Sequence, residues 1–334
     1  MRELRVIDET ESGDAVAEAV REGLLAYPKT LPPWLFYDEQ GSALFEQITA
    51  LPEYYLTRME RELLHRHGRE IAAGRDEWRR MSVVELGAGS AQKTAWLLRA
   101  LDAEGRGISY LPMDISATAL REAEEQLGRE FPQLRLRPVL TDFMRERPTL
   151  PIDAEAQRLL LWLGSSAGNF EMEDAVKILR DASAEMREGD LLLLGLDGAP
   201  EANGRETDKK ISDLLRAYDD AAGVTAAFNR NLLKRMGREL GAEFCVEQFE
   251  HEARWNGRTS CVEMHLVSKI AQSVFVRELE RSFDFQAGES IHTENSRKFT
   301  RDEARALVAA AGFSTVKSWH DPDGWYGLYL GQRV

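Results

Sequence analysis

Between residues 82 and 197, short apolar segments alternate with amphipathic ones, and this alternation constrains the fold more than any other feature. SVVELGAG, ISYLPMDIS, LRLRPVLTDF, RLLLWLG and DLLLLGLD have the pattern of strands, and segments of helical pattern separate most of them. Strands that alternate with helices form βαβ units around a parallel sheet. Because the apolar runs are almost unbroken, we expect helices on both faces of the sheet. The sequence therefore predicts an α/β fold with a Rossmann-like, doubly wound sheet.

The alternation stops after Asp197, which predicts an inserted α+β second lobe. The polar segment 198–210 predicts an exposed connection, and a long helical stretch follows that is interrupted near Gly223. Strand-like segments come next, with a hairpin turn at Asn256-Gly257. The expected division is an N-terminal helical and aromatic segment (1–62) packed on the main domain, the nucleoside-binding domain itself (63–196), an inserted substrate lobe (197–286) and a return to the main domain (287–334).

Composition and charge exclude several classes of partner. The chain has 43 basic and 57 acidic residues, a net charge of −14, so the basic surface that binds nucleic acid is not expected. No apolar run reaches the roughly 20 residues that span a bilayer, and the first residues lack the apolar core of a signal peptide. The two cysteines stand apart and form no metal-binding motif. We expect a cytoplasmic, monomeric protein with a small-molecule partner, no nucleic-acid or membrane partner and no metal.

A glycine turn after the first strand predicts a nucleoside site. In Glu85-Leu-Gly87-Ala-Gly89-Ser the backbone can turn tightly and approach a ligand at a helix N-terminus. Such a turn also occurs without a ligand. Asp114, however, ends the second strand, where a carboxylate accepts hydrogen bonds from ribose hydroxyls. Gln92 replaces the third glycine of the dinucleotide fingerprint, which favours S-adenosylmethionine over NAD.

The next two strand ends carry further candidates. Asp142 and Phe143 follow the third strand and suit the amino group and the ring face of adenine. The segment from Gly164 to Asn169 follows the fourth strand and would lie at the same edge, because ligands of open α/β sheets bind beyond the carboxyl ends of the strands. Its small residues and Asn169 could bring backbone carbonyls and an amide close to a methyl acceptor.

Seven motifs in order carry a resemblance to a known family: LPEYY, ELGAGSAQKT, PMDIS, GSSAGNF, AYDDAAGVTAAFNRN, VEMHL and TENSRKF. They resemble the histidine Nα-methyltransferases of ergothioneine biosynthesis, from about residue 30 to the C-terminus. The resemblance implies a class I methyltransferase domain with an inserted lobe. It also implies three successive methylations of L-histidine by S-adenosylmethionine to give trimethylhistidine (hercynine).

The resemblance also assigns residues to the site. The cofactor-binding positions it implies are Tyr37, Gly87, Lys93, Asp114, Asp142 and Phe143. The substrate-binding positions are Phe45, Tyr54, Asn169, Tyr218, Thr225, Met264, Glu294 and Ser296. Tyr54, Asn169 and Tyr218 would hold the carboxylate, Glu294 and Ser296 would meet the imidazole, and the amine would lie near Tyr37 and Gly164. No catalytic base is implied, because the enzyme acts by positioning. The segment 198–210 departs from the family pattern, because it is longer and more polar than the usual connection. Asn295 lies between the two imidazole positions, where the pattern requires no particular residue.

Three other functions remain open at this point. An Nα-methyltransferase of another amino acid, such as tryptophan, keeps the fold but has less need of Glu294. A nucleoside-binding regulatory protein would make no S-adenosylhomocysteine. An NAD-dependent oxidoreductase is opposed by Gln92. Without the resemblance, Glu294 and Ser296 could also cap the following helix, although Thr300 is the better cap.

Overall fold

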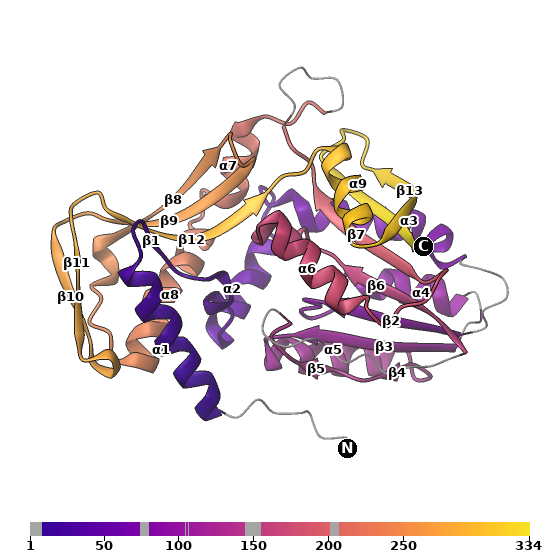
Figure 1. Cartoon of the computed structure of the whole chain (residues 1–334), viewed down its shortest axis with the longest axis horizontal. Coiled ribbons are helices and arrows are strands. Elements are labelled where there is room, and N and C mark those ends of the chain that lie inside the picture. Colours follow the sequence, from indigo (N-terminus) through magenta and orange to yellow (C-terminus); the bar gives the residue numbers. More distant parts are fainter. Residues whose placement is uncertain (1–8, 74–79, 104, 106, 144–154, 201–206) are drawn as a thin grey trace. The chain divides into compact units, whose positions relative to one another are not determined.

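The computed structural model describes residues 9–73, 80–103, 105, 107–143, 155–200 and 207–334, which form two compact units (Figure 1). The first unit combines Leu56–Lys209 with Arg297–Val334. The second combines the N-terminal segment through Tyr55 with Lys210–Ser296. The chain thus leaves the first unit after Lys209 and re-enters it at Arg297. No helix of the described residues is both long enough and apolar enough to cross a membrane.

The first unit is built around a mostly parallel sheet. Its strands are β2 (Arg80–Leu86), β3 (Gly107–Asp114), β4 (Arg135–Leu136), β5 (Val139–Leu140), β6 (Ala156–Trp162), β7 (Leu191–Asp197), β13 (Phe313–His320) and β14 (Tyr326–Arg333). Its helices are α3 (Tyr55–Ala72), α4 (Thr94–Ala103), α5 (Ala117–Glu130), α6 (Met172–Ala182), α9 (Arg301–Ala310) and the 3₁₀ turn η2 (Ser166–Asn169).

The strand order β13-β14-β7-β6-β2-β3-β4 confirms the predicted Rossmann-like sheet, with β14 antiparallel to both of its neighbours. The two halves of the sheet wind outward from β2, which pairs with β3 on one side and β6 on the other. The strand expected over 134–143 is divided into β4 and β5. Pro138 lies between them, and proline has no N–H to donate to a sheet.

Helices cover both faces of this sheet, as its unbroken apolar strands predict. Side chains of α6 and α9 pack on one face in a core that includes Leu86, Trp162 and Leu194. The helices α4 and α5 contact β3 and contribute no described residue to that core. The glycine turn and the segment that begins at Gly164 therefore follow strands that are almost entirely buried, β2 and β6.

The second unit is an α+β assembly (Figure 1). Its helices are α1 (Glu9–Leu25), α2 (Glu39–Thr49), α7 (Ile211–Tyr218) and α8 (Val224–Leu240), with 3₁₀ turns η1 (Pro33–Phe36), η3 (Val246–Gln248) and η4 (Arg277–Leu279). Its strands are β1 (Lys29–Thr30), β8 (Phe249–Asn256), β9 (Cys261–Ser268), β10 (Gln272–Val276), β11 (Arg281–Phe285) and β12 (Ser290–Arg297). One sheet has the order β1-β12-β9-β8, and β10 and β11 form a separate hairpin.

Two local predictions for this unit are confirmed. The β8 and β9 strands are antiparallel and are joined through the Asn256-Gly257 turn. The long helical stretch is broken in the predicted place, where Gly223 has φ +75° and precedes α8. A left-handed backbone of this kind favours glycine.

The N-terminal segment does not follow the expected division, because it groups with residues 210–296. The reason lies in its contacts. β1 pairs in parallel with β12, Lys29 opposite Ile291, and α2 packs on α8. Asp38 accepts a hydrogen bond from Asn231 at 2.7 Å and pairs with Arg238. The boundaries also differ from the expected 196/197 and 286/287, since the chain crosses at 209/210 and 296/297.

A buried charge cluster in the first unit holds the chain at both connections, just before 209/210 and just after 296/297. Asp197, at the end of β7, forms ion pairs with Lys209 and with Lys298, and all three side chains are 0% exposed. The expectation that segment 198–210 is exposed is therefore wrong at Thr207 and Lys209, which are buried; residues 201–206 lie outside the described residues. Lys209 also donates to the carbonyls of Gly198 and Trp325 at 2.8 and 2.7 Å, which explains its burial.

Asp197→Asn should destabilise the protein strongly, because it leaves two buried ammonium groups without their counter-charge. Breaking a buried ion pair costs about 3–5 kcal/mol, and denaturant unfolding followed by tryptophan fluorescence measures it. The control is Asp181→Asn, which removes the exposed pair with Lys177 and should change the free energy of unfolding by about 0.5 kcal/mol or less. Similar losses in the two variants would show that the Asp197 cluster does not stabilise the fold.

Candidate functional site

The glycine turn and Asp114 are joined by hydrogen bonds. Gly87 and Gly89 have φ +66° and +56°, so both positions favour glycine. One carboxylate oxygen of Asp114 accepts from the Gly89 N–H at 2.8 Å, and the other accepts from the Ser116 N–H at 2.8 Å. The aspartate thus fixes the turn after β2 against the end of β3.

Asp114 retains the capacity to bind a ligand. Burial raises the pKa of its carboxyl group, while the amide hydrogen bonds oppose that effect by stabilising the charged form. The Ile115 N–H also stabilises the charged form of this carboxyl group. Because an ionised carboxylate has about four lone-pair sites, it can still accept a hydrogen bond from a ribose hydroxyl. The residues present therefore fit the nucleoside of S-adenosylmethionine.

The end of β5 lies beside the same edge of the sheet. The Thr141 N–H donates to the Asp114 carbonyl at 3.0 Å, which brings Asp142 and Phe143 next to β3. The ring of Phe143 meets Trp162 edge to face, with centroids 6.2 Å apart. Asp142 and Phe143 are both half-buried. Their order, a carboxylate and then a ring packed on the core, suits a polar aromatic ligand.

The turn after β6 is tightly built. Ser165 has φ +57° and precedes η2. A β-carbon on Gly168 would lie 2.6 Å from the Arg297 carbonyl oxygen, so the turn packs closely against the re-entering chain. Ser166 Oγ lies 3.9 Å from the β-carbon position of Gly87, and Lys93 Nζ lies 2.9 Å from that of Gly164. The structure thus brings Gly87, Lys93 and Gly164 together.

The second unit contains a continuous run of aromatic side chains. Ring centroids are 5.8 Å apart between Tyr37 and Phe45, 6.3 Å between Phe45 and Tyr54, and 6.0 Å between Tyr54 and Tyr218. Each pair meets edge to face. Four predicted site residues, directly after η1, in α2, directly before α3 and at the end of α7, are therefore neighbours. Aromatic rings with hydroxyls offer an apolar wall and hydrogen bonds at once.

This run ends next to Ser296, one of the predicted imidazole-binding positions. The hydroxyls of Tyr218 and Ser296 are hydrogen-bonded at 2.7 Å, and both residues are buried. Thr225 lies one helical turn before Phe228, whose ring contacts Tyr37 and Phe45. The N–H and the side chain of Thr225 both hydrogen-bond the Asp220 carboxylate, the N–H at 2.7 Å.

Met264 and Glu294 lie on the adjacent strands β9 and β12. Met264 is buried, and its carbonyl accepts from Thr293 Oγ1 at 3.0 Å. Glu294 is half-buried. Thr300 makes the side-chain cap of α9 by accepting from the Glu303 N–H, so Glu294 and Ser296 are not needed for that cap.

The two units divide the predicted site residues unequally. Tyr37, a predicted cofactor residue, belongs to the second unit, and Asn169, a predicted substrate residue, belongs to the first. The other predicted cofactor residues are in the first unit, and the other predicted substrate residues are in the second.

Three residues beside the predicted set were missed by the sequence reasoning. Phe228 stacks on Phe36 at 4.4 Å, and its position three residues after Thr225 could have suggested it. Glu85 is fully buried, and burial raises its pKa to about 7, although Tyr110 and Thr94 donate hydrogen bonds to it. Glu60 is also fully buried. The mixed charges that follow it in α3 indicate a solvated face and give no signal of its burial.

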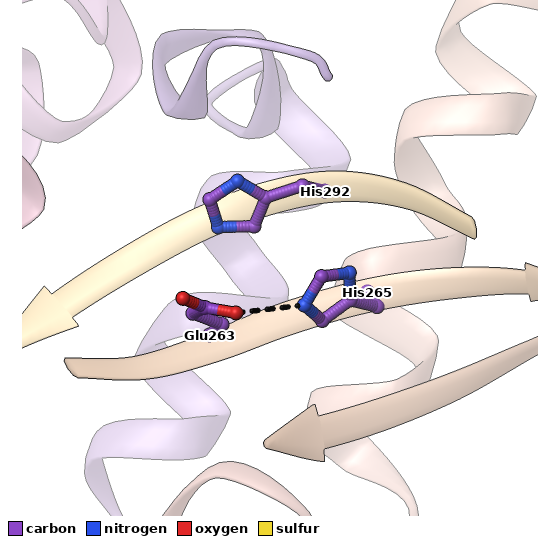
Figure 2. A group of neighbouring side chains, drawn as sticks. All are labelled: Glu263, His265 and His292. Atoms are coloured by element: carbon purple, nitrogen blue, oxygen red, sulfur yellow. Dashed lines mark hydrogen bonds and ion pairs between the residues drawn. The ribbon is translucent and has the colours of Figure 1, made fainter. Parts of the chain in front are cut away.

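A group of Glu263, His265 and His292 faces one side of the β9–β12 pair (Figure 2), with one potential ligand atom of each within 4.8 Å of the others. His265 Nε2 lies 3.3 Å from the Glu263 carboxylate. His265 Nδ1 is buried and has no hydrogen-bond partner among the described residues, so its proton belongs on Nε2. His292 Nε2 lies 3.0 Å from the Glu294 carbonyl and must donate to it. With both Nε2 atoms as donors, the three side chains form a hydrogen-bonded group next to Glu294.

His265 should make the protein less stable in acid. Burial, with the charges of Arg254 and His292, lowers its pKa to about 4, and Glu263 opposes this shift only in part. The unfolded histidine binds a proton near pH 6.5 and the folded one near pH 4, so the free energy of unfolding decreases as the pH falls through this interval. His265→Gln should lose less stability between neutral and acidic pH in denaturant titrations. An unchanged dependence on pH would contradict the assignment.

Comparison with known proteins agrees with this geometry. The family of histidine-specific, S-adenosylmethionine-dependent methyltransferases matches residues 16–333. The histidine N-alpha-methyltransferase of Mycolicibacterium smegmatis is 42% identical, over 96% of this chain and 97% of its own length. That of Mycobacterium tuberculosis is 40% identical, over 96% and 95%. The ergothioneine biosynthesis protein 1 of Neurospora crassa is 29% identical, over 91% of this chain and 33% of its own. Since the family model spans most of the chain and two relatives are at least 40% identical over 96% of it, the chain belongs to the histidine-specific, S-adenosylmethionine-dependent methyltransferases.

Proposed function

We propose that this protein methylates the α-amino group of L-histidine three times, with S-adenosylmethionine as donor, to give hercynine in ergothioneine biosynthesis. The names of its relatives support the substrate and the pathway. The observation that carries the proposal is the hydrogen bond between Tyr218 and Ser296, at 2.7 Å. It joins a residue proposed to hold the carboxylate to one proposed to hold the imidazole, at the buried end of the aromatic run.

The first unit supplies the proposed contacts to the donor. Asp114 accepts from the ribose hydroxyls, and Asp142 and Phe143 meet the adenine. Lys93 lies beside Gly164 and offers its ammonium group to the carboxylate of the donor. Gly87 lets the backbone approach the ligand. S-adenosylmethionine, when bound, supplies the electrophilic methyl group on its sulfonium.

The second unit supplies most of the proposed contacts to the amino acid. Tyr54 and Tyr218 donate hydroxyl hydrogens to its carboxylate, and Asn169 of the first unit adds an amide. Glu294 accepts from one imidazole N–H, and the Ser296 hydroxyl serves the other nitrogen. Phe45, Thr225 and Met264 line this site. A buried polar pair that matches an imidazole rejects side chains that cannot satisfy it, by up to about 10⁴-fold.

The chemistry requires position more than a strong base. In each step the neutral amine forms a bond to the methyl carbon as the carbon–sulfur bond breaks, and S-adenosylhomocysteine leaves. The α-amino group of a free amino acid is largely protonated at neutral pH, because its own carboxylate stabilises the ammonium form, so a proton must leave to solvent before each transfer. Orientation alone can lower such a barrier by about 7–11 kcal/mol. The third transfer leaves a quaternary nitrogen without a lone pair, and the reaction stops there.

Both cysteines, Cys245 and Cys261, are thiols, which fits the cytoplasmic location that we propose.

Histidine incubated with the protein and S-adenosylmethionine should gain three methyl groups, with three equivalents of S-adenosylhomocysteine formed. Mass spectrometry of the products measures both. Tryptophan, tested in parallel, should give no product, because an indole has a single ring nitrogen and cannot satisfy both Glu294 and Ser296. Turnover of tryptophan without turnover of histidine would overturn the proposed substrate. Absence of S-adenosylhomocysteine with every amino acid would mean that the protein binds nucleosides without methylating.

Two substitutions should separate the proposed binding sites. Glu294→Ala should raise the KM for histidine by about 100-fold, the cost of a lost charged hydrogen bond, and leave that for S-adenosylmethionine nearly unchanged. Asp114→Ala should raise the KM for S-adenosylmethionine and leave the KM for histidine nearly unchanged. Steady-state kinetics with each substrate varied in turn measures both. Equal losses for the two substrates in Glu294→Ala would show that Glu294 is structural.

A further inference from the structure

Glu60, on α3, is a fully buried carboxylate and is not among the residues proposed to contact the donor or the amino acid. Its side chain is 0% exposed. Buried carboxylates are rare unless charged partners and hydrogen bonds compensate for the lost hydration. The groups that compensate Glu60 therefore indicate why it is there.

Three donors from distant parts of the chain converge on this carboxylate. One oxygen accepts from the Gly164 N–H at 2.7 Å and from the Tyr326 hydroxyl at 2.6 Å. The other accepts from Lys93 Nζ at 2.6 Å. Glu60 thus links the helix α3, the turn after β6, the last strand and the residue that precedes α4.

The sheet is shaped to admit this carboxylate. Gly195 lies in the middle of β7, where a side chain would normally pack. A β-carbon at this position would overlap the Glu60 carboxylate and would also meet the Tyr326 hydroxyl at 2.7 Å. A glycine in a strand interior often marks close approach of another group. The carboxylate therefore occupies a fixed position with little room to move.

Lys93 is the partner whose charge matters most. Its side chain is 25% exposed, so the ammonium group is partly open while its counter-charge is entirely buried. Its Nζ also lies 2.9 Å from the β-carbon position of Gly164. Glu60 therefore holds both the Lys93 ammonium and the Gly164 amide, two groups that we assign to the donor and to the edge near the amine.

We propose that Glu60 is a charge-balancing and positioning residue for the methyl donor, which lets Lys93 bind the donor's carboxylate without repelling its sulfonium. This inference rests on the proposed function, in which Lys93 contacts the donor. In S-adenosylmethionine a short carbon chain separates the carboxylate from the sulfonium, so a cation that binds the first lies close to the second. The Lys93 ammonium and the Glu60 carboxylate together have no net charge, so the pair repels the sulfonium far less than an unpaired ammonium would.

The test compares two ligands that differ in that charge. S-adenosylmethionine has a sulfonium, whereas S-adenosylhomocysteine has a neutral thioether and the same nucleoside and amino-acid groups. Glu60→Gln should weaken S-adenosylmethionine by about tenfold or more, the scale of an uncompensated charge nearby, and S-adenosylhomocysteine by at most about threefold. Isothermal titration gives both Kd values. All titrations use one pH, because the neighbouring carboxyl of Glu85 has a pKa of about 7.

Two further variants make the test independent of general damage to the fold. Lys93→Gln leaves the Glu60 charge uncompensated, so it should shift the ratio of the two Kd values in the opposite direction, in favour of the sulfonium. The double variant Glu60→Gln/Lys93→Gln should restore a ratio close to that of the wild type, although both ligands bind more weakly. Such coupling is expected of residues in direct contact.

Tyr326→Phe is the matched control, because it removes one donor to Glu60 and leaves both charges. Its ratio of Kd values should equal that of the wild type, and thermal unfolding reports how much each substitution destabilises the protein. Equal weakening of both ligands in Glu60→Gln would overturn the proposal and make Glu60 purely structural. Unchanged binding of both in Glu60→Gln would overturn it by showing that the Glu60 charge does not act on the donor.

These outcomes are distinct from failure of the proposed function. The wild-type protein is assayed separately for methylation of histidine. If it binds both nucleosides but does not methylate histidine, the substrate proposal fails while the ratio of Kd values still tests Glu60. If it methylates histidine and the ratio is unchanged in all variants, the role of Glu60 fails while the function stands. If it binds neither nucleoside, both fail.

Discussion

The ion-pair cluster of Asp197 with Lys209 and Lys298 is the constraint on which the rest of the structure depends. A unit inserted into another domain needs its two connections held, and here one buried carboxylate at the end of β7 holds both. The backbone N–H of Asp197 also donates to Ser165 Oγ at 2.9 Å. The residue that secures the connections thus also supports the turn that ends in Asn169. Burial of these charges is costly in itself, so we interpret the cluster as a device that specifies where the inserted unit begins and ends.

The α/β domain could be predicted from the sequence because its signals are local. Each strand is an apolar run beside a helical segment, and even the division of one strand at Pro138 follows from a single residue type. The organisation of the second unit could not be predicted in this way. Lys29 and Ile291 are distant in sequence, and a strand of two residues such as β1 has almost no pattern of its own. The burial of Lys209 was missed because a polar segment with lysines normally lies in solvent.

The candidate site shows the same limit. Gly87, Asp114 and Asp142 follow strand ends, and the topology of a parallel sheet brings such positions to one edge. Tyr54, Tyr218 and Glu294 have no local pattern that marks them, and their assignment came from the resemblance. Glu60 could not be found by either route. Its hydroxyl partner Tyr326 is 266 positions away, and the charges that follow it along α3 resemble those of an exposed helix.

The parallel pairing of β1 with β12 has a consequence for the order in which the molecule can be made. The ribosome releases the N-terminal segment first, but its sheet partner Ile291 is synthesised near the end. Until α8 is made, Phe36, Tyr37 and Phe45 also lack Phe228, the ring against which they pack. Exposed aromatic surface on a nascent chain favours aggregation. Vectorial synthesis therefore leaves the N-terminal aromatic segment without these partners while β2 to β7 are made, and any chain that stops before α8 retains that exposed surface.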